Sequence, residues 1–257
     1  MKILIIGDVV SSNGCEYLRE VLPNLKKEFN IDVAIVNGEN SAVGNGVLPN
    51  SANHILDSGA NVVTTGNHSL KRREVYDYFD SGAPIIRPCN YHKSAPGKGM
   101  YIIDKGFAQV AVINVQGAVY MEPVRNPFDI IDDQIQKAKD ENCKIIIVDF
   151  HAEATAEKRS MGFYLDGRVS AVVGTHTHVQ TSDAQILPKG TAYITDLGMT
   201  GVKNSVLGIT AELAIEKLRT NLPTKFANPD GECIIEGCVI EIDNKTGLAV
   251  SIKAIRR

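Results

Sequence analysis

Residues 2–8 have the sequence KILIIGD, an aliphatic run that ends on a glycine and a carboxylate. Four consecutive aliphatic residues, Ile3 to Ile6, are typical of a strand that is buried on both faces of a sheet. A second strand of this kind is predicted at 33–36, and a third at 61–64. Segments with helical spacing of apolar residues lie between them. This alternation predicts an α/β fold with parallel strands.

The rest of the chain continues the pattern. Further strands are predicted near 100–104, 108–114, 144–149, 171–173, 184–187 and 191–195, with a C-terminal hairpin at 233–242 and 247–255. Helices are predicted around 18–29 (shortened or kinked by Pro23), at 49–58, at 71–79, after a cap at Asn126 and Pro127, after 153 as far as about 161, and at 209–219. Proline and glycine in 81–99 indicate a loop. The hairpins predict mixed sheets, and the lack of linkers or repeats predicts a single domain over 1–257.

Composition excludes several classes of protein. The 257 residues are 44% hydrophobic and 22% charged, with a net charge of −3, which is ordinary for a globular chain and excludes a disordered or collagen-like one. The charge and the lack of a basic run argue against extended nucleic acid as a partner. No run reaches the roughly 18 apolar residues of a membrane span, and the first run is too short for a signal peptide. Five cysteines without a close pair indicate reduced thiols and a cytoplasmic location.

Side chains that can bind metals follow five of the predicted strands. They are Asp8, Glu39, Asn40, Asn67, His68, His151, His176 and His178. In open α/β sheets, ligands bind beyond the carboxyl ends of the strands. Carboxylate, amide and imidazole groups suit first-row divalent or trivalent metals, and the absence of thiolates argues against a structural zinc site. A pair of metals needs a bridging carboxylate and about three further ligands for each ion, which this set can provide.

Taken singly, these residues have ordinary explanations. Asp8 could cap a helix, Asn67 could form a turn, and Glu39 could be a polar loop residue. A lone histidine is usually hydrogen-bonded or exposed, and this is the interpretation for His54 and His92. All of the ordinary explanations together would require several coincidences, so a metal site is favoured.

The order of these motifs resembles the calcineurin-like metallophosphoesterases. The matching motifs are Gly7-Asp8, Gly66-Asn67-His68, the isolated His151, and GTHTH at 174–178. NGEN at 37–40, the segment 161–167 and YITDLGMTG at 193–201 are similar to one branch, the YmdB-type bacterial cyclic-nucleotide phosphodiesterases. The sequence departs from the wider superfamily at Val10, where a histidine is usual, at Glu39, where an aspartate is usual, and at Ser69. As in the YmdB-type branch, Asn40 is expected to replace the missing histidine.

The resemblance implies a four-layer αββα sandwich, a cytoplasmic enzyme and two metal ions per chain, iron or manganese, with zinc as the alternative. One ion is assigned to Asp8, Glu39, Asn40 and His178, and the other to Glu39, Asn67, His151 and His176, with Glu39 bridging. The implied activity is phosphodiester hydrolysis of cyclic nucleotides, 2′,3′-cyclic before 3′,5′-cyclic. A homo-oligomer is also implied.

The mechanism expected for such a site is in-line attack on phosphorus by a hydroxide shared between the ions. His68 is the candidate general acid for the leaving ribose oxygen. A purely electrostatic contact between His68 and a phosphate oxygen is the alternative role. Two alternative functions stay open at this point: a metal-dependent phosphomonoesterase or nuclease, and a nucleotide-sensing regulatory scaffold with little turnover.

Overall fold

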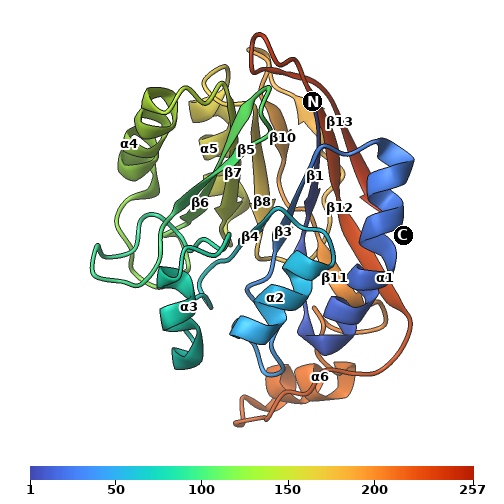
Figure 1. Cartoon of the computed structure of the whole chain (residues 1–257). Helices are drawn as coiled ribbons and strands as arrows, with labels where there is room; N and C mark the ends of the chain where they lie inside the picture. Colours follow the sequence, from blue (N-terminus) through green and yellow to red (C-terminus); the bar gives the residue numbers. More distant parts are fainter.

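Strand β1 (Lys2–Ile6) shows how the aliphatic runs build the layers of the protein. Its alternate side chains face opposite sides, as in any strand. Ile3 and Ile5 are buried in a core between two β-sheets, whereas Leu4 and Ile6 are buried in a second core against helices. The computed structural model describes residues 1–257 and shows these two sheets face to face, with helices on their outer sides (Figure 1).

The first sheet contains seven strands and is mixed. Its order is β2-β11-β12-β1-β3-β4, with β13 paired to β12. Besides β1, its strands are β2 (Asp8–Val9), β3 (Val33–Asn37), β4 (Val62–Thr64), β11 (Met199–Val202), β12 (Cys233–Ile242) and β13 (Ala249–Arg256). Strands β1, β3 and β4 are parallel, so their carboxyl ends meet at one edge. Strand β12 is antiparallel to β1, to β11 and to β13.

The second sheet contains six strands in the order β5-β6-β7-β8-β10-β9. The strands are β5 (Met100–Asp104), β6 (Gln109–Gln116), β7 (Ile145–His151), β8 (Ala171–Thr175), β9 (Gln185–Ile186) and β10 (Ala192–Ile194). Strands β6, β7, β8 and β10 are parallel, and the outer strands β5 and β9 are antiparallel to their neighbours. Both sheets are therefore mixed, as the hairpins in the sequence predict.

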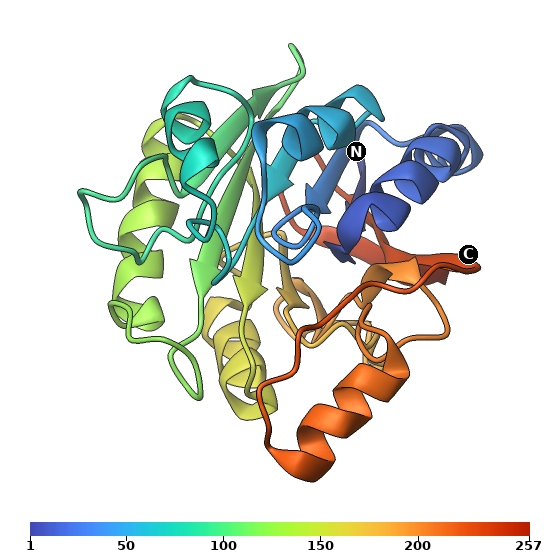
Figure 2. The same ribbon diagram turned by 90° about the horizontal axis from the view of Figure 1, so that it is seen from below.

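Helices cover the outer face of each sheet and complete the four layers. The first sheet is covered by α1 (Ser11–Phe29), α2 (Pro49–Asp57), the 3₁₀ turn η1 (Arg73–Val75) and α3 (Tyr76–Asp80). The second sheet is covered by α4 (Pro127–Asp140) and α5 (Thr155–Leu165). Helix α6 (Ala211–Thr220) lies outside these layers (Figure 2). The αββα sandwich is confirmed. None of the helices combines the length and the apolarity that crossing a bilayer requires.

Three local expectations were wrong. Pro23 does not shorten helix α1, which continues to Phe29, and this proline is at an exposed position of the helix. The helix predicted over 71–79 starts only at residue 73, because the Arg72 guanidinium donates to the carbonyl oxygens of Val43 and Asn45 and so ties that residue to another loop. The short strands β2 and β11 were not predicted, since two to four residues carry too little periodicity.

Candidate metal centre

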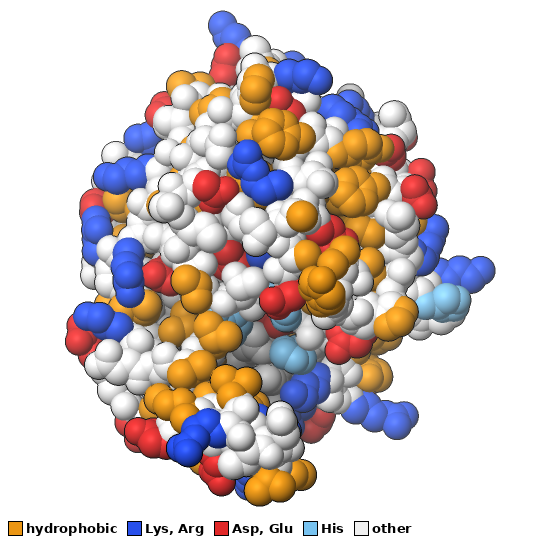
Figure 3. Space-filling model, turned by 180° about the vertical axis from the view of Figure 1, so that it is seen from behind, with side chains coloured by type: hydrophobic (Ala, Val, Ile, Leu, Met, Phe, Trp, Pro, Cys, Tyr) orange, Lys and Arg blue, Asp and Glu red, His pale blue; other side chains and the backbone are white.

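The carboxyl ends of five strands deliver the predicted side chains to one place. Asp8 follows β1 at the start of β2; Glu39 and Asn40 follow β3; Asn67 and His68 follow β4; His151 ends β7; His176 and His178 follow β8. All eight lie in one cluster of contacts, described below. The space-filling view shows histidine side chains gathered in a hollow near the middle of one face (Figure 3).

Glu39 lies at the centre of the cluster and is fully buried. Its Oε1 lies 3.1 Å from His68 Nδ1 and 3.4 Å from His151 Nε2. The Asn40 amide donates to the same oxygen at 3.0 Å. One carboxylate therefore faces ligands from both sheets, as a bridging ligand must.

Asp8 defines one side of the cluster, together with Asn40 and His178. Its Oδ1 lies 3.6 Å from His178 Nε2, and Asn40 Nδ2 lies 3.2 Å from the same ring nitrogen. Asp8 is fully buried, and this Oδ1 has no hydrogen-bond partner. A buried carboxylate oxygen without a partner costs free energy unless a cation satisfies it. This oxygen and its neighbours therefore fit a metal ion.

Asn67, His151 and His176 define the other side. His151 Nε2 lies 3.0 Å from Asn67 Oδ1 and 3.1 Å from His176 Nδ1. Ligand atoms of Glu39, His151 and His176 all lie within 4.8 Å of one another. Oxygen and imidazole nitrogen atoms that converge in this way suit first-row metals. The second side of the cluster thus also fits an ion, and Glu39 belongs to both sides.

A buried hydrogen-bond chain orients the ring of His151. Thr175 Oγ1 lies 2.9 Å from His151 Nδ1 and donates to Asp149 Oδ1 at 2.7 Å. The hydroxyl can therefore accept from Nδ1, which leaves Nε2 for the centre. Burial raises the pKa of Asp149 to about 6, and hydrogen bonds from Thr64 and Thr175 oppose that rise.

The loop with the other two histidines is held by a buried ion pair. His176 and His178 have φ angles of 100° and 62°, a backbone region that non-glycine residues rarely occupy. Between them, the backbone N–H and the hydroxyl group of Thr177 both donate to Asp196 Oδ2, at 3.1 and 2.8 Å. The Lys158 ammonium group donates to that oxygen at 2.7 Å and to the Thr175 carbonyl oxygen at 2.8 Å. The pair thus fixes a strained loop that carries two predicted ligands.

Charge interactions within the centre shift several pKa values. Burial raises the pKa values of Asp8 and Glu39, but the neighbouring imidazoles more than offset this, so both pKa values lie below their ordinary range. Burial lowers the pKa of His151, but Glu39 overrides it and the pKa rises to about 9. Asp8 likewise raises the pKa of His178 against the effect of burial. Burial and the neighbouring His151 lower the pKa of His176. Without a metal, His151 thus keeps a proton that faces Glu39 at neutral pH.

His68 and Gly66 have separate parts in this geometry. His68 Nδ1 lies 2.9 Å from Asn40 Oδ1, and its backbone N–H donates to Glu39 Oε2 at 3.0 Å. Its side chain is 27% exposed, so the ring borders both the centre and the solvent. A Cβ atom on Gly66 would lie only 2.3 Å from the His151 ring. Glycine is therefore required there for the segment after β4 to pack against the His151 ring.

Sequence reasoning missed the residues that support the ligands: Asp149, Thr175, Lys158, Asp196 and Glu153, the last of which lies 3.1 Å from His176 Nε2. Asp149 carried a usable signal, because it is a carboxylate within an otherwise apolar run. His54 and His92 lie outside the centre, as expected: His54 is on α2 near Glu16, and His92 is exposed.

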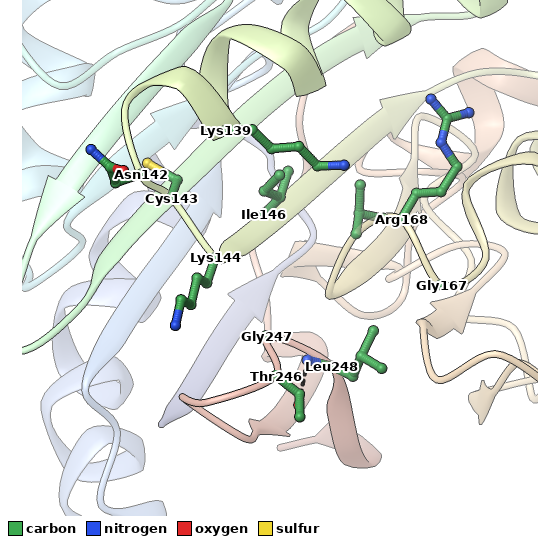
Figure 4. Close-up of a pocket in the computed structure, with 11 residues that line it drawn as sticks. Lys139, Asn142, Cys143, Lys144, Ile146, Gly167, Arg168, Thr246, Gly247 and Leu248 are labelled. Atoms are coloured by element: carbon green, nitrogen blue, oxygen red, sulfur yellow. Dashed lines mark hydrogen bonds between the residues drawn. The ribbon is translucent and has the colours of Figure 1, made fainter.

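A cavity of about 430 Å³ lies at the opposite ends of β7 and β8 (Figure 4). It is bordered by Lys139, Lys144 and Arg168, and it contains none of the predicted ligands. Arg168 pairs with Asp132 at 2.5 Å, and the Lys144 and Arg168 side chains point away from each other. The side chains predicted to bind metal therefore lie at the carboxyl ends of the strands, away from this cavity.

Comparison with known proteins gives whole-chain matches. A family model described as "YmdB-like protein" matches residues 4–255. A Bacillus subtilis protein named 2′,3′-cyclic-nucleotide 2′-phosphodiesterase is 45% identical over 255 residues, which are 99% of this chain and 96% of that protein.

Solved structures agree with this chain in fold over its full length. A hypothetical protein from Thermus thermophilus has a TM-score of 0.94 and 36% identity, covering 100% of this chain and 99% of that one. A Mycoplasma pneumoniae protein described as a novel phosphatase has a TM-score of 0.94 and 31% identity, covering 100% and 93% of the two chains.

Proposed function

Because the chain belongs to the YmdB-like protein family, we propose that it is a metal-dependent phosphodiesterase that hydrolyses cyclic nucleotides, 2′,3′-cyclic before 3′,5′-cyclic. The observation that carries the proposal is the shared position of Glu39 between two groups of ligands. The activity for which the 45% identical Bacillus subtilis relative is named supports the choice of substrate.

We assign two ions to the centre, iron or manganese. Asp8, Glu39, Asn40 and His178 would hold one, and Glu39, Asn67, His151 and His176 the other. When bound, such a pair supplies Lewis-acid activation of water and neutralises charge on the phosphoryl oxygens. The unpartnered Asp8 Oδ1 and the converging nitrogens of His151 and His176 support this assignment.

His68 is the proposed general acid for the leaving ribose oxygen. Its Nδ1 is turned toward Asn40 and Glu39, so Nε2 is the atom that can deliver a proton to substrate. The contacts from Asn40 and Glu39 also fix the orientation of the ring. General acid catalysis by a positioned side chain contributes about 10²–10⁴ in rate.

The substrate is tested with a panel of diesters and monoesters. Manganese-loaded protein is assayed with 2′,3′-cyclic and 3′,5′-cyclic nucleotides, cyclic dinucleotides and nucleoside monophosphates. We expect the highest kcat/KM with a 2′,3′-cyclic nucleotide. Hydrolysis of monoesters alone would refute the diesterase assignment, and substrate binding with no single-turnover product would indicate a sensing scaffold.

The role of His68 is tested by substitution. His68→Ala should lower kcat by about 10²–10⁴ while the metal content stays unchanged, because only the proton donor is lost. His54→Ala is the matched control, since His54 lies on α2 outside the centre and should keep full turnover. Unchanged kcat in His68→Ala across the pH range would remove this residue from the mechanism.

A further inference from the structure

The loop over residues 117–125 follows β6 and is fixed at both of its ends. At its start, the buried Glu157 carboxylate accepts from the backbone N–H groups of Ala118, at 2.8 Å, and Val119, at 3.3 Å. At its end, the fully buried Asn90 side chain donates to the Arg125 carbonyl oxygen at 3.0 Å. Hydrogen bonds therefore hold the loop in a defined conformation, although most of its side chains are exposed.

Tyr120 lies near the middle of this loop and has an unusual exposure and backbone conformation. Its side chain is 89% exposed, and its φ angle is 62°. A left-handed backbone at a bulky residue costs free energy, and such residues cluster at active sites and ligand clamps. Packing within the protein does not explain the position of this ring, which is presented to solvent.

Two hollows connect this loop to the metal centre. One has a volume of about 420 Å³ and is lined by Tyr120, Met121, Glu122, Asn67 and His176. The other has a volume of about 400 Å³ and is also lined by Asn67 and Glu122. Because Asn67 and His176 are proposed metal ligands, both hollows open beside the centre. Cavities of this size are typical of sites for small molecules.

The second hollow has an aromatic wall at Tyr91. The Tyr91 hydroxyl oxygen lies 2.8 Å from Gln116 Oε1 and 3.0 Å from the Gly66 carbonyl oxygen, and its one O–H can donate to either acceptor, so the ring is held in place. Arg125 and Glu122 also line this hollow, and neither of them has an ion-pair partner in the protein. The wall thus places a fixed aromatic ring, over which the Arg87 guanidinium lies 6.0 Å from the centroid, beside a cation and an anion that have no ion-pair partner.

We infer that these hollows bind the nucleoside part of the substrate, with the base stacked on Tyr120 and its polar edge facing Glu122 and Arg125. This inference rests on the proposed function, because the phosphate is assumed to lie at the metal centre. Every nucleobase can stack on an aromatic side chain, whichever base it is, while charged side chains recognise the polar edge of the base. The 117–125 loop is thus a determinant of substrate specificity.

The test compares nucleoside 2′,3′-cyclic phosphates with ribose 2,3-cyclic phosphate, which has the same reacting ring and no base. The wild type should prefer the nucleotides by kcat/KM. Tyr120→Ala should lower that preference about tenfold, which is the order of one base–aromatic contact. Phe107→Ala is the matched control, because Phe107 is an exposed aromatic residue at the far end of β6 and should keep the full preference.

A binding measurement separates this inference from the proposed function. Adenosine, guanosine, cytidine and uridine are titrated into wild type and Tyr120→Ala by calorimetry, and Tyr120→Ala should bind them about tenfold more weakly. Nucleoside binding without hydrolysis of any cyclic phosphate supports the hollows as a nucleoside site and refutes the proposed function. Hydrolysis with equal kcat/KM for the nucleotide and the ribose phosphate, or a preference that Tyr120→Ala leaves intact, overturns the inference alone. If the protein neither binds nucleosides nor hydrolyses any cyclic phosphate, both the inference and the proposed function are overturned.

Discussion

The two sheets contribute different chemistry to the metal centre. The first sheet carries the proposed oxygen ligands, Asp8, Glu39, Asn40 and Asn67, and the second carries the proposed imidazole ligands, His151, His176 and His178. The imidazole half has a buried supporting layer behind it, namely Asp149, Thr175, Lys158 and Asp196. The oxygen ligands contact mainly one another and the histidines.

A difference in geometry explains this asymmetry. A carboxylate offers two equivalent oxygens, so several orientations can satisfy a metal. An imidazole must place one of two distinct nitrogens toward the ion, and the partner of the other nitrogen sets which one it is. The two carboxylates of the first half, Asp8 and Glu39, therefore act through charge, and the imidazoles of the second half through orientation. Substitutions in the two halves should therefore impair the centre in different ways, which metal content, stability and metal affinity can distinguish.

Glu39→Gln should have the largest effect, because it removes the charge of the one ligand that belongs to both sides. We expect both ions to be lost or weakly held, and turnover to fall by more than the roughly 100-fold that changes in supporting residues cause. Elemental analysis measures the metal content, and a steady-state assay with a cyclic nucleotide measures kcat. Glu241→Gln, at an exposed position on β12, is the control. Retained metal with full turnover in Glu39→Gln would contradict the bridging role.

Lys158→Met should cause the next largest effect, on stability. It leaves Asp196 buried without its cation, and breaking one partner of a buried pair costs about 3–5 kcal/mol. Urea unfolding of the metal-free protein measures the loss. Lys203→Met is the matched control, since Lys203 pairs with Glu232 at the surface and such a pair contributes at most about 1 kcal/mol. Equal losses in the two variants would show that the Lys158–Asp196 pair is not a structural support.

Thr175→Val should have a smaller effect, specific to metal binding. The substitution keeps the shape of the side chain but removes the hydroxyl between Asp149 and His151, so the ring loses its orienting contact. Loss of such a contact lowers metal affinity by about 10–100-fold. Manganese affinity is measured by competition with a chelator.

Thr191→Val provides the control for that experiment. Thr191 is also fully buried and donates its hydroxyl to the Val169 carbonyl oxygen at 2.7 Å, away from the centre. Both variants should lose stability, and only Thr175→Val should lose metal affinity. If the affinities of the two variants match, the Thr175 hydroxyl does not orient His151.

The clustering of the proposed ligands could be predicted from the sequence, whereas the residues that support them could not, for a physical reason. Each proposed ligand closely follows an aliphatic strand, so strand periodicity alone places it at the carboxyl edge of a sheet. Lys158 lies within a helix, where a lysine is ordinarily exposed, and its burial depends on the path of the distant 196 region. The left-handed backbone at His176 and His178 likewise has no local signature, because tertiary contacts impose it.

The dependence of manganese affinity on pH should distinguish the carboxylates from the imidazoles. This is the smallest of the expected effects, about tenfold in affinity per pH unit. The pKa values of Asp8 and Glu39 are lowered, so both are ionised throughout the neutral range. The pKa of His151 is raised to about 9, so its proton competes with a metal ion below that pH. Manganese affinity should therefore rise between pH 7 and 9, by up to about tenfold per unit for each proton displaced. Isothermal titration in two buffers of different ionisation enthalpy measures both the affinity and the protons released.

Stability of the metal-free protein should change in the opposite direction over the same range. A histidine whose folded pKa is raised stabilises the fold fully below its unfolded pKa of about 6.5, and this contribution is lost as pH rises through about 9. The free energy of unfolding without metal should thus fall from pH 6.5 to 9, while manganese binding strengthens. If instead the metal-free protein gained stability over this interval, His151 would not carry a proton facing Glu39, and the pairing of a charged carboxylate with a titrating imidazole in this centre would be wrong.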